Sequence, residues 1–506
     1  MQPVAFWPAI FLIFIPPVWM LDRLWSSQGQ AALGKRLRLA AALGWFWGFG
    51  YFVAGLWWLG KAFLVEADQF AWAMPFGVLG LPAVLAVFPA LAFAAACLLW
   101  SRSPARILAF TFMISAAEWL RGHLFTGFPW NTPGMAFGNH LVLMQGASLI
   151  GLYGLTILVI FIGSAPATLI DNGSRSRKFS MPAMAVVLLA IVATGGYMRV
   201  PPMLLPLDPS IRLRILQPNV PQDANFNSAN GEAILDGYLA LSRQPTATGA
   251  LPTHYIWPES AFPFLLHRNL DALDRIAELL RPNNAYLITG AARMGPPLPG
   301  EEAGTFFNAI QAIDSNGIIR DTYDKVHLVP FGEYEPAFSK TLLRMTGLHQ
   351  FVSIPGGFTP ADIREPFNVP GLPPLAGSIC YEAIFPGAVL PPGGDRPGVI
   401  VNVTNDAWFG DSPGPYQHFA QARLRSVEEG LPLIRAANSG ISAIVDPYGR
   451  VLMRSGLNEA TVLDFGLPLP LLEPTFFSRW RDLPFAVLLT LCFIGAFFSR
   501  RREIST

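Results

Sequence analysis

Residues 375–382 read LAGSICYE, a short apolar run that ends in a cysteine followed by a tyrosine and a glutamate. An apolar run of this length is typical of a buried β-strand. The chain has three cysteines, and two of them, Cys97 and Cys492, lie in long apolar runs. Cys380 lies in a part of the chain that reads as soluble, so it is either a small buried hydrophobe or a reactive thiol.

Similar strand-like runs recur on both sides of this stretch, and helical patterns lie between some of them. Strands that alternate with helices predict an α/β domain, which we place at residues 205–470. Such domains carry their chemistry where strands end and loops begin. The predicted strands lie within residues 211–220, 254–260, 285–293, 306–314, 375–382, 398–408 and 441–449, and the predicted helices within 269–281 and 415–430.

The composition of the whole chain indicates a membrane protein. Its 506 residues are 52% hydrophobic and 14% charged, with a mean hydropathy of +0.39. Ordinary globular domains are about 25% charged. The 14 Trp and 38 Phe fit aromatic belts at membrane surfaces. The net charge of +1 gives no overall field that would attract nucleic acid.

Long apolar runs occupy residues 1–200 and recur near the carboxyl terminus. A membrane-spanning helix needs about 20 mostly apolar residues. The sequence therefore predicts about six spans before the α/β domain and one after it, at 482–498. The two longest are long enough to include re-entrant or interfacial turns. The predicted spans are 4–21, 39–60, 72–100, 105–120, 142–170, 181–198 and 482–498.

Basic residues on the loops predict the orientation. Loops on the cytoplasmic side carry an excess of Lys and Arg. The loops at 22–38, 101–106 and 171–180 and the tail at 500–502 are all basic, so we assign them to the cytoplasm. The α/β domain is then extracytoplasmic, and six spans place residue 1 outside as well. No basic residue precedes the first apolar run, so we expect an incomplete first span or a missing upstream helix.

Three predicted strand ends carry residues with chemical potential. Glu259 ends the run IWPES, Lys325 and Glu333 lie in YDKVHLVPFGEYEP, and Cys380 ends the run LAGSIC. Each has an ordinary alternative: a loop carboxylate, a solvated strand end or a buried small side chain. Together they supply a base, a cation and a nucleophile, which are the groups that acyl transfer needs.

The chemistry of these groups is complementary. A free thiol has a pKa of about 8.5 and is mostly protonated at neutral pH. A carboxylate such as Glu259 can accept its proton during attack, and an ammonium can stabilise the oxyanion that forms. No metal and no cofactor is expected, because the histidines of the domain show no metal-binding pattern. They are His254, His267, His327 and His418.

The segments WPES, DKVHLVPFGE and ICYE resemble the three signatures of the nitrilase, or carbon–nitrogen hydrolase, superfamily. The membrane spans narrow the resemblance to the apolipoprotein N-acyltransferase family. Three further segments resemble that family: EWLRGHLFTGFPW (118–130), NDAWFG (405–410) and GPYQHFAQARLRS (414–426). The resemblance implies an αββα sandwich and a Glu-Lys-Cys triad.

By this resemblance Cys380 is the nucleophile, Glu259 the base and Lys325 the oxyanion cation. Supporting roles fall to Glu333, which would position Lys325, and to the two residues after the thiol, Tyr381 and Glu382. Apolar and aromatic residues in loops also suggest a lipid-binding group, for which packing inside the domain or an interfacial belt is the ordinary alternative. In this group a phenylalanine at 226 departs from the tryptophan that the family leads us to expect. The group is Phe226, Trp130, Phe331, Phe338 and Leu342.

The resemblance also implies a reaction. Members move a fatty acyl chain from a membrane phospholipid to the α-amino group of the diacylglyceryl-cysteine that begins an apolipoprotein. The expected route is ping-pong, through a thioester on Cys380. The expected location is the bacterial inner membrane, as a multi-pass protein whose catalytic domain faces the periplasm. Members usually have seven spans before this domain, whereas six are predicted here.

Two other functions fit parts of the sequence. A membrane-tethered nitrilase-type amidase that hydrolyses a small amide would use the same triad. A transporter or channel with an outer domain would need ionisable residues inside its spans. Glu118 and Arg121 lie at a span end, and the other spans carry almost none.

Overall fold

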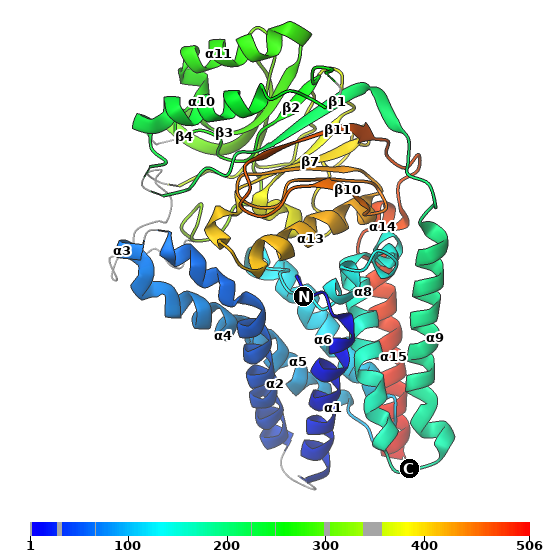
Figure 1. Ribbon diagram of the computed structural model, residues 1–506. Helices are drawn as coiled ribbons and strands as arrows, with labels where there is room; N and C mark the ends of the chain where they lie inside the picture. The colour runs from blue at the N-terminus through cyan, green and yellow to red at the C-terminus, as the bar shows by residue number, and fades with distance from the viewer. Residues whose placement is uncertain are drawn as a thin grey trace. The chain divides into compact units, whose positions relative to one another are not determined.

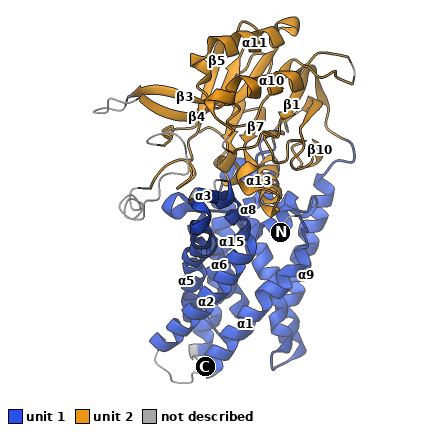
Figure 2. Cartoon of the chain, turned by 60° about the vertical axis from the view of Figure 1, so that its left-hand side comes forward, with its two compact units in different colours: residues 1–203, 427–430, 473–506 blue, residues 204–426, 431–472 orange. Residues whose placement is uncertain are grey.

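The computed structural model describes residues 3–27, 33–65, 67–223, 225–247, 249–297, 304–336 and 357–505. The chain forms two compact units (Figure 2). The first holds residues 1–203, 427–430 and 473–506, and the second holds residues 204–426 and 431–472. We call them the helical unit and the α/β unit.

Helices make up the helical unit (Figure 1). They include short helices between the long ones, notably where the third predicted span is broken by a π-helical turn at Phe76–Gly80. The α-helices are α1 (Ile10–Ser27), α2 (Leu33–Leu56), α3 (Ala67–Phe70), α4 (Leu81–Leu85), α5 (Val87–Leu99), α6 (Arg106–His123), α7 (Met135–Gly138), α8 (Ala147–Ser164), α9 (Arg175–Arg199), α14 (Phe476–Trp480) and α15 (Leu483–Ser505).

Within the described residues, six helical segments are long and apolar enough to cross a membrane: Trp7–Ser26, Leu33–Leu64, Ala71–Leu99, Leu143–Ile170, Arg175–Arg199 and Leu483–Glu503. Five of them correspond to spans predicted before the α/β domain, and the sixth is the predicted span after it. The span predicted at 105–120 corresponds to α6, which is not among the six segments and stays a prediction. This helix is more polar than its apolar centre suggests, because it carries Arg106, Glu118 and Arg121.

The charges of α6 are buried inside the helical unit. Arg121 is 1% exposed and pairs with Glu118 at 2.5 Å. Its guanidinium also donates to the carbonyl of Trp130 at 2.9 Å, which ties the loop after α6 to the helix. Ionisable groups in a membrane unit persist when they are paired in this way.

The loops predicted to be cytoplasmic lie at one end of the helical unit. Arg106 forms ion pairs with Asp22, at the end of α1, and with Asp171, in the loop before α9, at 2.8 and 2.6 Å. The backbone N–H of Arg102 donates to Glu503 near the end of α15 at 2.9 Å. These contacts place the four basic segments on the same side of the unit.

Two prolines inside long helices leave carbonyls that another helix satisfies. Pro17 of α1 has no N–H, so the carbonyl of Ile13 loses its partner within the helix. That carbonyl accepts the indole N–H of Trp47, from α2, at 3.2 Å. In α9, the carbonyl four residues before Pro182 accepts the hydroxyl of Thr168 at 2.8 Å. These two carbonyls are thus satisfied by protein groups and not by water.

The segment 427–430 ends helix α13 (Pro413–Glu429), whose earlier residues lie in the α/β unit. Its two glutamates are fully buried. Glu428 accepts the backbone N–H of Leu152 at 2.8 Å, and Glu429 accepts from the Arg481 guanidinium at 2.5 Å. These hydrogen bonds explain why the end of α13 belongs with residues far away in the sequence.

The α/β unit contains two sheets. The six-stranded sheet has the order β11-β1-β2-β3-β4-β5, and its central strands β1, β2 and β3 are parallel. The helices α10 (Gly231–Ser242) and α11 (Leu270–Leu280) pack on it. Its strands are β1 (Leu207–Gln217), β2 (His254–Ile256), β3 (Tyr286–Pro297), β4 (Gly304–Ile313), β5 (Ile319–Asp324) and β11 (Thr461–Pro468).

The second sheet has five strands in the order β10-β9-β8-β7-β6, with β6, β7 and β8 parallel. Every residue of β6, β7 and β8 is buried, as expected of parallel strands covered on both faces. The strands are β6 (Leu375–Ile379), β7 (Val399–Thr404), β8 (Leu433–Ala437), β9 (Ala443–Val445) and β10 (Val451–Arg454).

Three apolar clusters join these elements into four layers. The largest lies between the sheets and includes Ile256 and Ile288 from the first and Val401 from the second. One outer cluster packs α10 and α11 on the first sheet, and another packs α13 on the second, through residues such as Phe419. The order helix, sheet, sheet, helix confirms the predicted αββα sandwich (Figure 1).

Each of the seven predicted strand regions contains a strand, and both predicted helices form. The sequence analysis did not identify β5, β8, β10, β11 or α10. Strands β5 and β10 are only partly buried and lack a clean apolar alternation. These strands are held by pairing with distant neighbours, which a local pattern does not reveal.

Candidate active site

The candidate residues follow the carboxyl ends of strands. Strand β4 runs antiparallel to both β3 and β5, so β5 points the same way as β2 and β3. Glu259 follows β2, Lys325 follows β5 directly, and Cys380 follows β6 directly. Strands that point the same way bring their carboxyl ends to one edge of a sheet, where ligands of α/β folds bind.

The ammonium of Lys325 lies between two carboxylates. Its Nζ atom donates to Glu333 Oε1 at 2.8 Å and lies 3.5 Å from Glu259 Oε1. The amide of Asn308 connects the same carboxylates, donating to Glu259 at 2.8 Å and to Glu333 at 2.7 Å. Lys325 is 1% exposed, so protein groups hold its charge in place. Glu333 therefore lies where its predicted supporting role requires.

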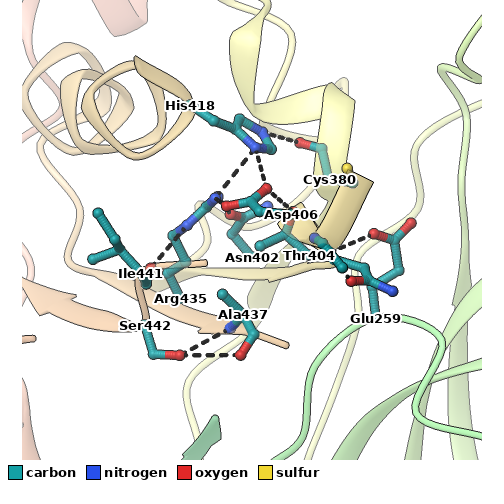
Figure 3. Close-up of polar contacts among 12 residues, drawn as sticks. Glu259, Cys380, Asn402, Thr404, Asp406, His418, Arg435, Ala437, Ile441 and Ser442 are labelled. Atoms are coloured by element: carbon teal, nitrogen blue, oxygen red, sulfur yellow. Dashed lines mark hydrogen bonds and ion pairs between the residues drawn. The ribbon is translucent and has the colours of Figure 1, made fainter. Parts of the chain in front are cut away.

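Glu259 faces Cys380 while its other contacts fix the carboxylate. Its Oε2 atom accepts the backbone N–H of Asn405 at 2.9 Å. Figure 3 shows the sulfur of Cys380 on the side of this carboxylate. The base, the cation and the thiol predicted from sequence are thus brought together, although their catalytic roles stay predictions.

Burial governs the protonation of this group. It raises the pKa of Glu259, and the positive charge of Lys325 offsets only part of the increase. Burial alone disfavours the ammonium of Lys325, but the carboxylates of Glu333 and Glu259 outweigh it and raise the pKa of Lys325. The cation therefore stays charged, while the base has a higher proton affinity than an exposed carboxylate.

Cys380 is a half-buried thiol in a left-handed backbone conformation, with φ of +47°. Burial and the negative charge of Glu259 raise the pKa of the thiol, and Lys325 opposes this only in part. The resting side chain is therefore a neutral thiol. It depends on a base at the moment of attack, which is the role that the position of Glu259 allows.

Glu382 joins the segments that carry Lys325 and Cys380. Its Oε1 atom accepts the two backbone N–H groups that follow Lys325, at 3.0 and 3.2 Å. Its Oε2 atom accepts the N–H of Ile379, just before Cys380, at 2.7 Å, and Arg364 balances its charge at 2.9 Å. A fully buried carboxylate with these partners supports the geometry of the site.

Tyr381, the residue after the thiol, is buried in an aromatic group. Its ring lies edge-on to Phe385 at 5.1 Å, and His327 stacks on the same phenylalanine at 3.8 Å. His327 and Tyr381 are themselves 5.7 Å apart. Tyr381 therefore packs against aromatic neighbours beside Cys380, and its supporting role stays a prediction.

A second polar group near Cys380 was missed by the sequence analysis. Asp406, after β7, accepts from Arg435 at 2.8 Å and from Thr404 at 3.1 Å, and its carboxylate lies 2.7 Å from His418 Nδ1. His418 in turn contacts the backbone carbonyl of Cys380 at 3.0 Å (Figure 3). Asp406, His418 and Arg435 lie in the segments NDAWFG, GPYQHFAQARLRS and LIRAA, and the first two segments carried the family resemblance without a role.

The predicted lipid-binding residues have different surroundings. Trp130 is 2% exposed in the helical unit and packs against Trp58 at 5.0 Å. Phe226 is half-buried in the loop after β1, and Phe331 is 41% exposed. Phe338 and Leu342 lie outside the described residues. A role in lipid binding stays a prediction for all five.

No group of three or more His, Cys, Asp or Glu side chains that could hold a metal ion occurs in the described ranges. The histidines predicted to be scattered have separate partners. His254 contacts the carbonyl of Pro370 at 3.0 Å, and His418 lies beside Asp406.

Gly290 of β3 allows Glu259 to approach the sheet. A Cβ atom at this position would lie 2.5 Å from the Cα of Glu259, which is closer than packed atoms allow. The two segments are hydrogen-bonded through Pro258 and Ala261 at 3.2 and 3.1 Å. A Gly290→Ala change must therefore displace the carboxylate.

We expect Gly290→Ala to lower the rate of acyl-enzyme formation by about 10²-fold, because a displacement near 1 Å has this effect on reacting groups. Single-turnover mass spectrometry of the purified variant measures this rate. Gly237→Ala is the control, since a Cβ at that exposed helical glycine meets no atom within 4 Å. An unchanged rate in Gly290→Ala would show that Glu259 need not lie where it does.

Comparison with known proteins connects this geometry to a family. The carbon-nitrogen hydrolase family model matches residues 245–475, and the model of the apolipoprotein N-acyltransferase N-terminal domain matches residues 1–165. The apolipoprotein N-acyltransferase of Rhodopseudomonas palustris is 47% identical, over 99% of this chain and 92% of that protein. The chain belongs to the apolipoprotein N-acyltransferase family. The enzyme of that name from Bradyrhizobium diazoefficiens is 46% identical, over 98% of this chain and 91% of its own.

Solved structures include more distant likenesses. An amidase of the nitrilase superfamily from Nesterenkonia, solved as a cysteine-to-alanine mutant, is 19% identical and covers 53% of this chain and 94% of its own, with a TM-score of 0.37. The same amidase as a glutamate-to-glutamine mutant, with a covalent adduct at its active-site cysteine, has a TM-score of 0.36. The family membership of this chain rests on the close relatives and not on these structures.

Proposed function

We propose that this protein transfers a fatty acyl chain from a membrane phospholipid to the α-amino group of the diacylglyceryl-cysteine at the start of apolipoproteins. The observation that supports it most is the buried grouping of Glu259, Lys325 and Cys380 at strand ends of a carbon–nitrogen hydrolase fold. The name shared by relatives of 47% and 46% identity over nearly the whole chain points to the same acceptor.

The first half of the reaction forms a thioester. The sulfur of Cys380 attacks the ester carbonyl of the phospholipid while Glu259 accepts the thiol proton. Lys325 stabilises the oxyanion of the tetrahedral intermediate. The ester C–O bond then breaks, the proton passes from Glu259 to the leaving oxygen, and a lysophospholipid departs. The raised pKa of the Cys380 thiol explains why the base must act during attack.

The second half forms the amide. The amine of the lipoprotein attacks the thioester carbonyl, and Lys325 again stabilises the oxyanion. The N–C bond forms first and gives a tetrahedral intermediate, and the C–S bond breaks when this intermediate collapses. The amine loses one proton to Glu259, which returns it to the sulfur of Cys380. A thioester is less stabilised by resonance than an ester, so cysteine suits a reaction whose acceptor is an amine.

The helical unit supports an assignment to the bacterial inner membrane. Six described helical segments are apolar enough to span it, and the basic loops lie together at one end of this unit. Positive loops remain in the cytoplasm. We therefore assign that end to the cytoplasm and the α/β unit to the periplasm, where the lipid-anchored substrates would reach it.

Acyl transfer is favoured over the two other functions. The likeness to amidases is limited to distant structures, whereas the acyltransferase relatives match nearly the whole chain. A transport role would draw on charges inside the spans. The buried charges of α6 instead pair with each other and with neighbouring loops.

The thioester can be tested directly. Purified full-length protein is incubated with phospholipid in detergent, without an amine acceptor, and its intact mass is taken. We expect a mass increase of one fatty acyl group that neutral hydroxylamine removes. In a Cys380→Ala protein we expect no increase, because the nucleophile is gone.

Addition of a diacylated lipoprotein peptide is then expected to remove the adduct from the enzyme and to place the acyl group on the peptide amine. An equal adduct on the Cys380→Ala protein would contradict the thioester. An adduct that water removes as fast as the peptide does would favour hydrolysis and return the amidase to consideration.

A further inference from the structure

Cys380 has a backbone conformation that needs support from its surroundings. Its φ of +47° lies in the left-handed region, which is unfavourable for a residue with a side chain. Its carbonyl lies 3.0 Å from His418 Nε2. Figure 3 shows this carbonyl turned toward His418 and the sulfur turned away from it. One hydrogen bond can therefore hold the backbone while leaving the thiol free to react.

The contact with the carbonyl defines the state of one ring nitrogen. A carbonyl oxygen only accepts hydrogen bonds, so Nε2 of His418 must donate. The ring is fully buried, on helix α13, and does not exchange this contact for water. The hydrogen bond thus connects α13 to the end of β6, which Cys380 follows.

Asp406 holds the other ring nitrogen. Its Oδ1 atom lies 2.7 Å from His418 Nδ1, and its Oδ2 atom accepts from Arg435 Nη2 at 2.8 Å. Burial alone would raise the pKa of Asp406, but Arg435 and His418 outweigh it and lower this pKa to about 2. His418 Nδ1 also lies 3.2 Å from Arg435 Nη2. The ring therefore cannot turn over without losing its contacts on both sides.

The same network reaches the strands beside Cys380. The hydroxyl of Thr404, at the end of β7, donates to Asp406 at 3.1 Å. Arg435 further donates to Asn402, whose amide donates to the carbonyl of Ser378 at 3.0 Å. The network therefore supports the strand end on which Cys380 lies.

We propose that His418 is a positioning residue for Cys380, oriented by Asp406. Its Nε2–H group holds the Cys380 carbonyl, so that the left-handed turn directs the sulfur toward Glu259. The positioning role depends on the proposed function only in the test that measures acyl transfer. It assigns a role to Asp406 and His418 beyond the triad and its immediate support.

Two substitutions of similar polarity separate this role from packing. The amide nitrogen of His418→Gln can take the place of Nε2 and donate to the Cys380 carbonyl. The amide nitrogen of His418→Asn reaches only the position of Nδ1, which faces Asp406. Both leave the Asp406–Arg435 ion pair intact, so both variants are expected to fold, which thermal unfolding of the full-length protein checks.

We expect thioester formation to slow by about 10²-fold in His418→Asn, because the nucleophile loses its alignment. In His418→Gln we expect a rate within about 5-fold of the wild type, because the donor is retained. Single-turnover mass spectrometry with phospholipid gives the rates. Equal rates in the two variants, whether both fast or both slow, would overturn the proposal.

His254 provides a matched control. Its Nε2 atom contacts the carbonyl of Pro370 at 3.0 Å, and its side chain is similarly buried in the same unit, at the start of β2. It has no place in the proposed chemistry. We expect His254→Gln and His254→Asn to form the thioester at equal rates. A difference as large as that at His418 would assign the effect to general packing.

A second measurement keeps the proposal separate from the proposed function. The alkylation rate of Cys380 by iodoacetamide, read from the mass of its peptide, requires no phospholipid. We expect it to fall in His418→Asn and to recover in His418→Gln. If the wild type forms no acyl adduct while alkylation follows this pattern, the proposed function fails and the positioning role stands. If alkylation is equal in the two variants, the positioning role fails.

Discussion

A Glu259→Gln protein is expected to form its acyl-thioester about 10³-fold more slowly than the wild type, within the range that general bases contribute. The amide preserves the size of the side chain but cannot accept the thiol proton. Lys325 keeps Glu333 as a counter-ion at 2.8 Å, so the charge of the site remains balanced. The loss is therefore expected in chemistry and not in folding.

The pH dependence should identify the base. A carboxylate accepts a proton only when ionised, so the wild-type rate is expected to rise with pH through the pKa of Glu259. Burial raises that pKa, which places the rise above the usual carboxyl range of about 4. In Glu259→Gln this rise should disappear. Single-turnover rates across pH, with Glu232→Gln as an exposed control, measure it; persistence of the rise would exclude Glu259 as the base.

A Lys325→Met protein is expected to lose thioester formation by about 10³-fold, because the oxyanion no longer faces a cation. It should also unfold more easily. Glu259 and Glu333 would face each other without a counter-ion, and breaking a buried pair costs about 3–5 kcal/mol. Denaturant unfolding and single-turnover rates on the same preparation measure both effects.

A double variant, Lys325→Met with Glu333→Gln, distinguishes catalysis from charge balance. Removing one carboxylate along with the ammonium returns the net charge of the group to its wild-type value and removes the repulsion between Glu259 and Glu333, so most of the lost stability should return. Thioester formation should stay as slow as in the single variant. Recovery of the rate in the double variant would mean that Lys325 serves only to neutralise the two carboxylates.

The positions of Glu259, Lys325 and Cys380 could be predicted because their signals are local. Each follows a strand-like run, and strands that point the same way end at one edge of a sheet. Strand β6, which precedes Cys380, belongs to the second sheet, so only the fold brings the thiol to the other two residues. The family resemblance gave the three residues an order and a role. Glu333 was found because it lies eight residues after Lys325 in the same quoted segment, and the fold turns that spacing into a direct contact.

The second polar network could not be predicted in the same way. Its members come from strands and a helix that look structural, and only the fold brings them together. A signal was nevertheless present in two runs. Asn402 and Arg435 each interrupt a largely apolar strand, in VIVNVT and LIRAA. A polar side chain that is fully enclosed needs a partner, so such interruptions indicate a buried network.

The membrane helices show the limit of composition. Hydropathy identified the most apolar helices but did not set α6 apart from them, although its apolar centre lies between Arg106 and the pair of Glu118 and Arg121. The placement of 427–430 in the helical unit had no local signal either. It depends on contacts with two distant residues. Leu152 lies hundreds of residues earlier in the chain, and Arg481 lies beyond a strand-rich region.

The prolines of α1 and α9 have a consequence for how the helices assemble. A helix inserted alone in the bilayer would hold the Ile13 carbonyl away from both water and any donor. Pairing with Trp47 of α2 removes that penalty, and only one register of the two helices aligns the groups. Apolar helix surfaces attract each other only weakly in a lipid bilayer. The unsatisfied Ile13 carbonyl therefore determines which helix packs against α1 and at what depth.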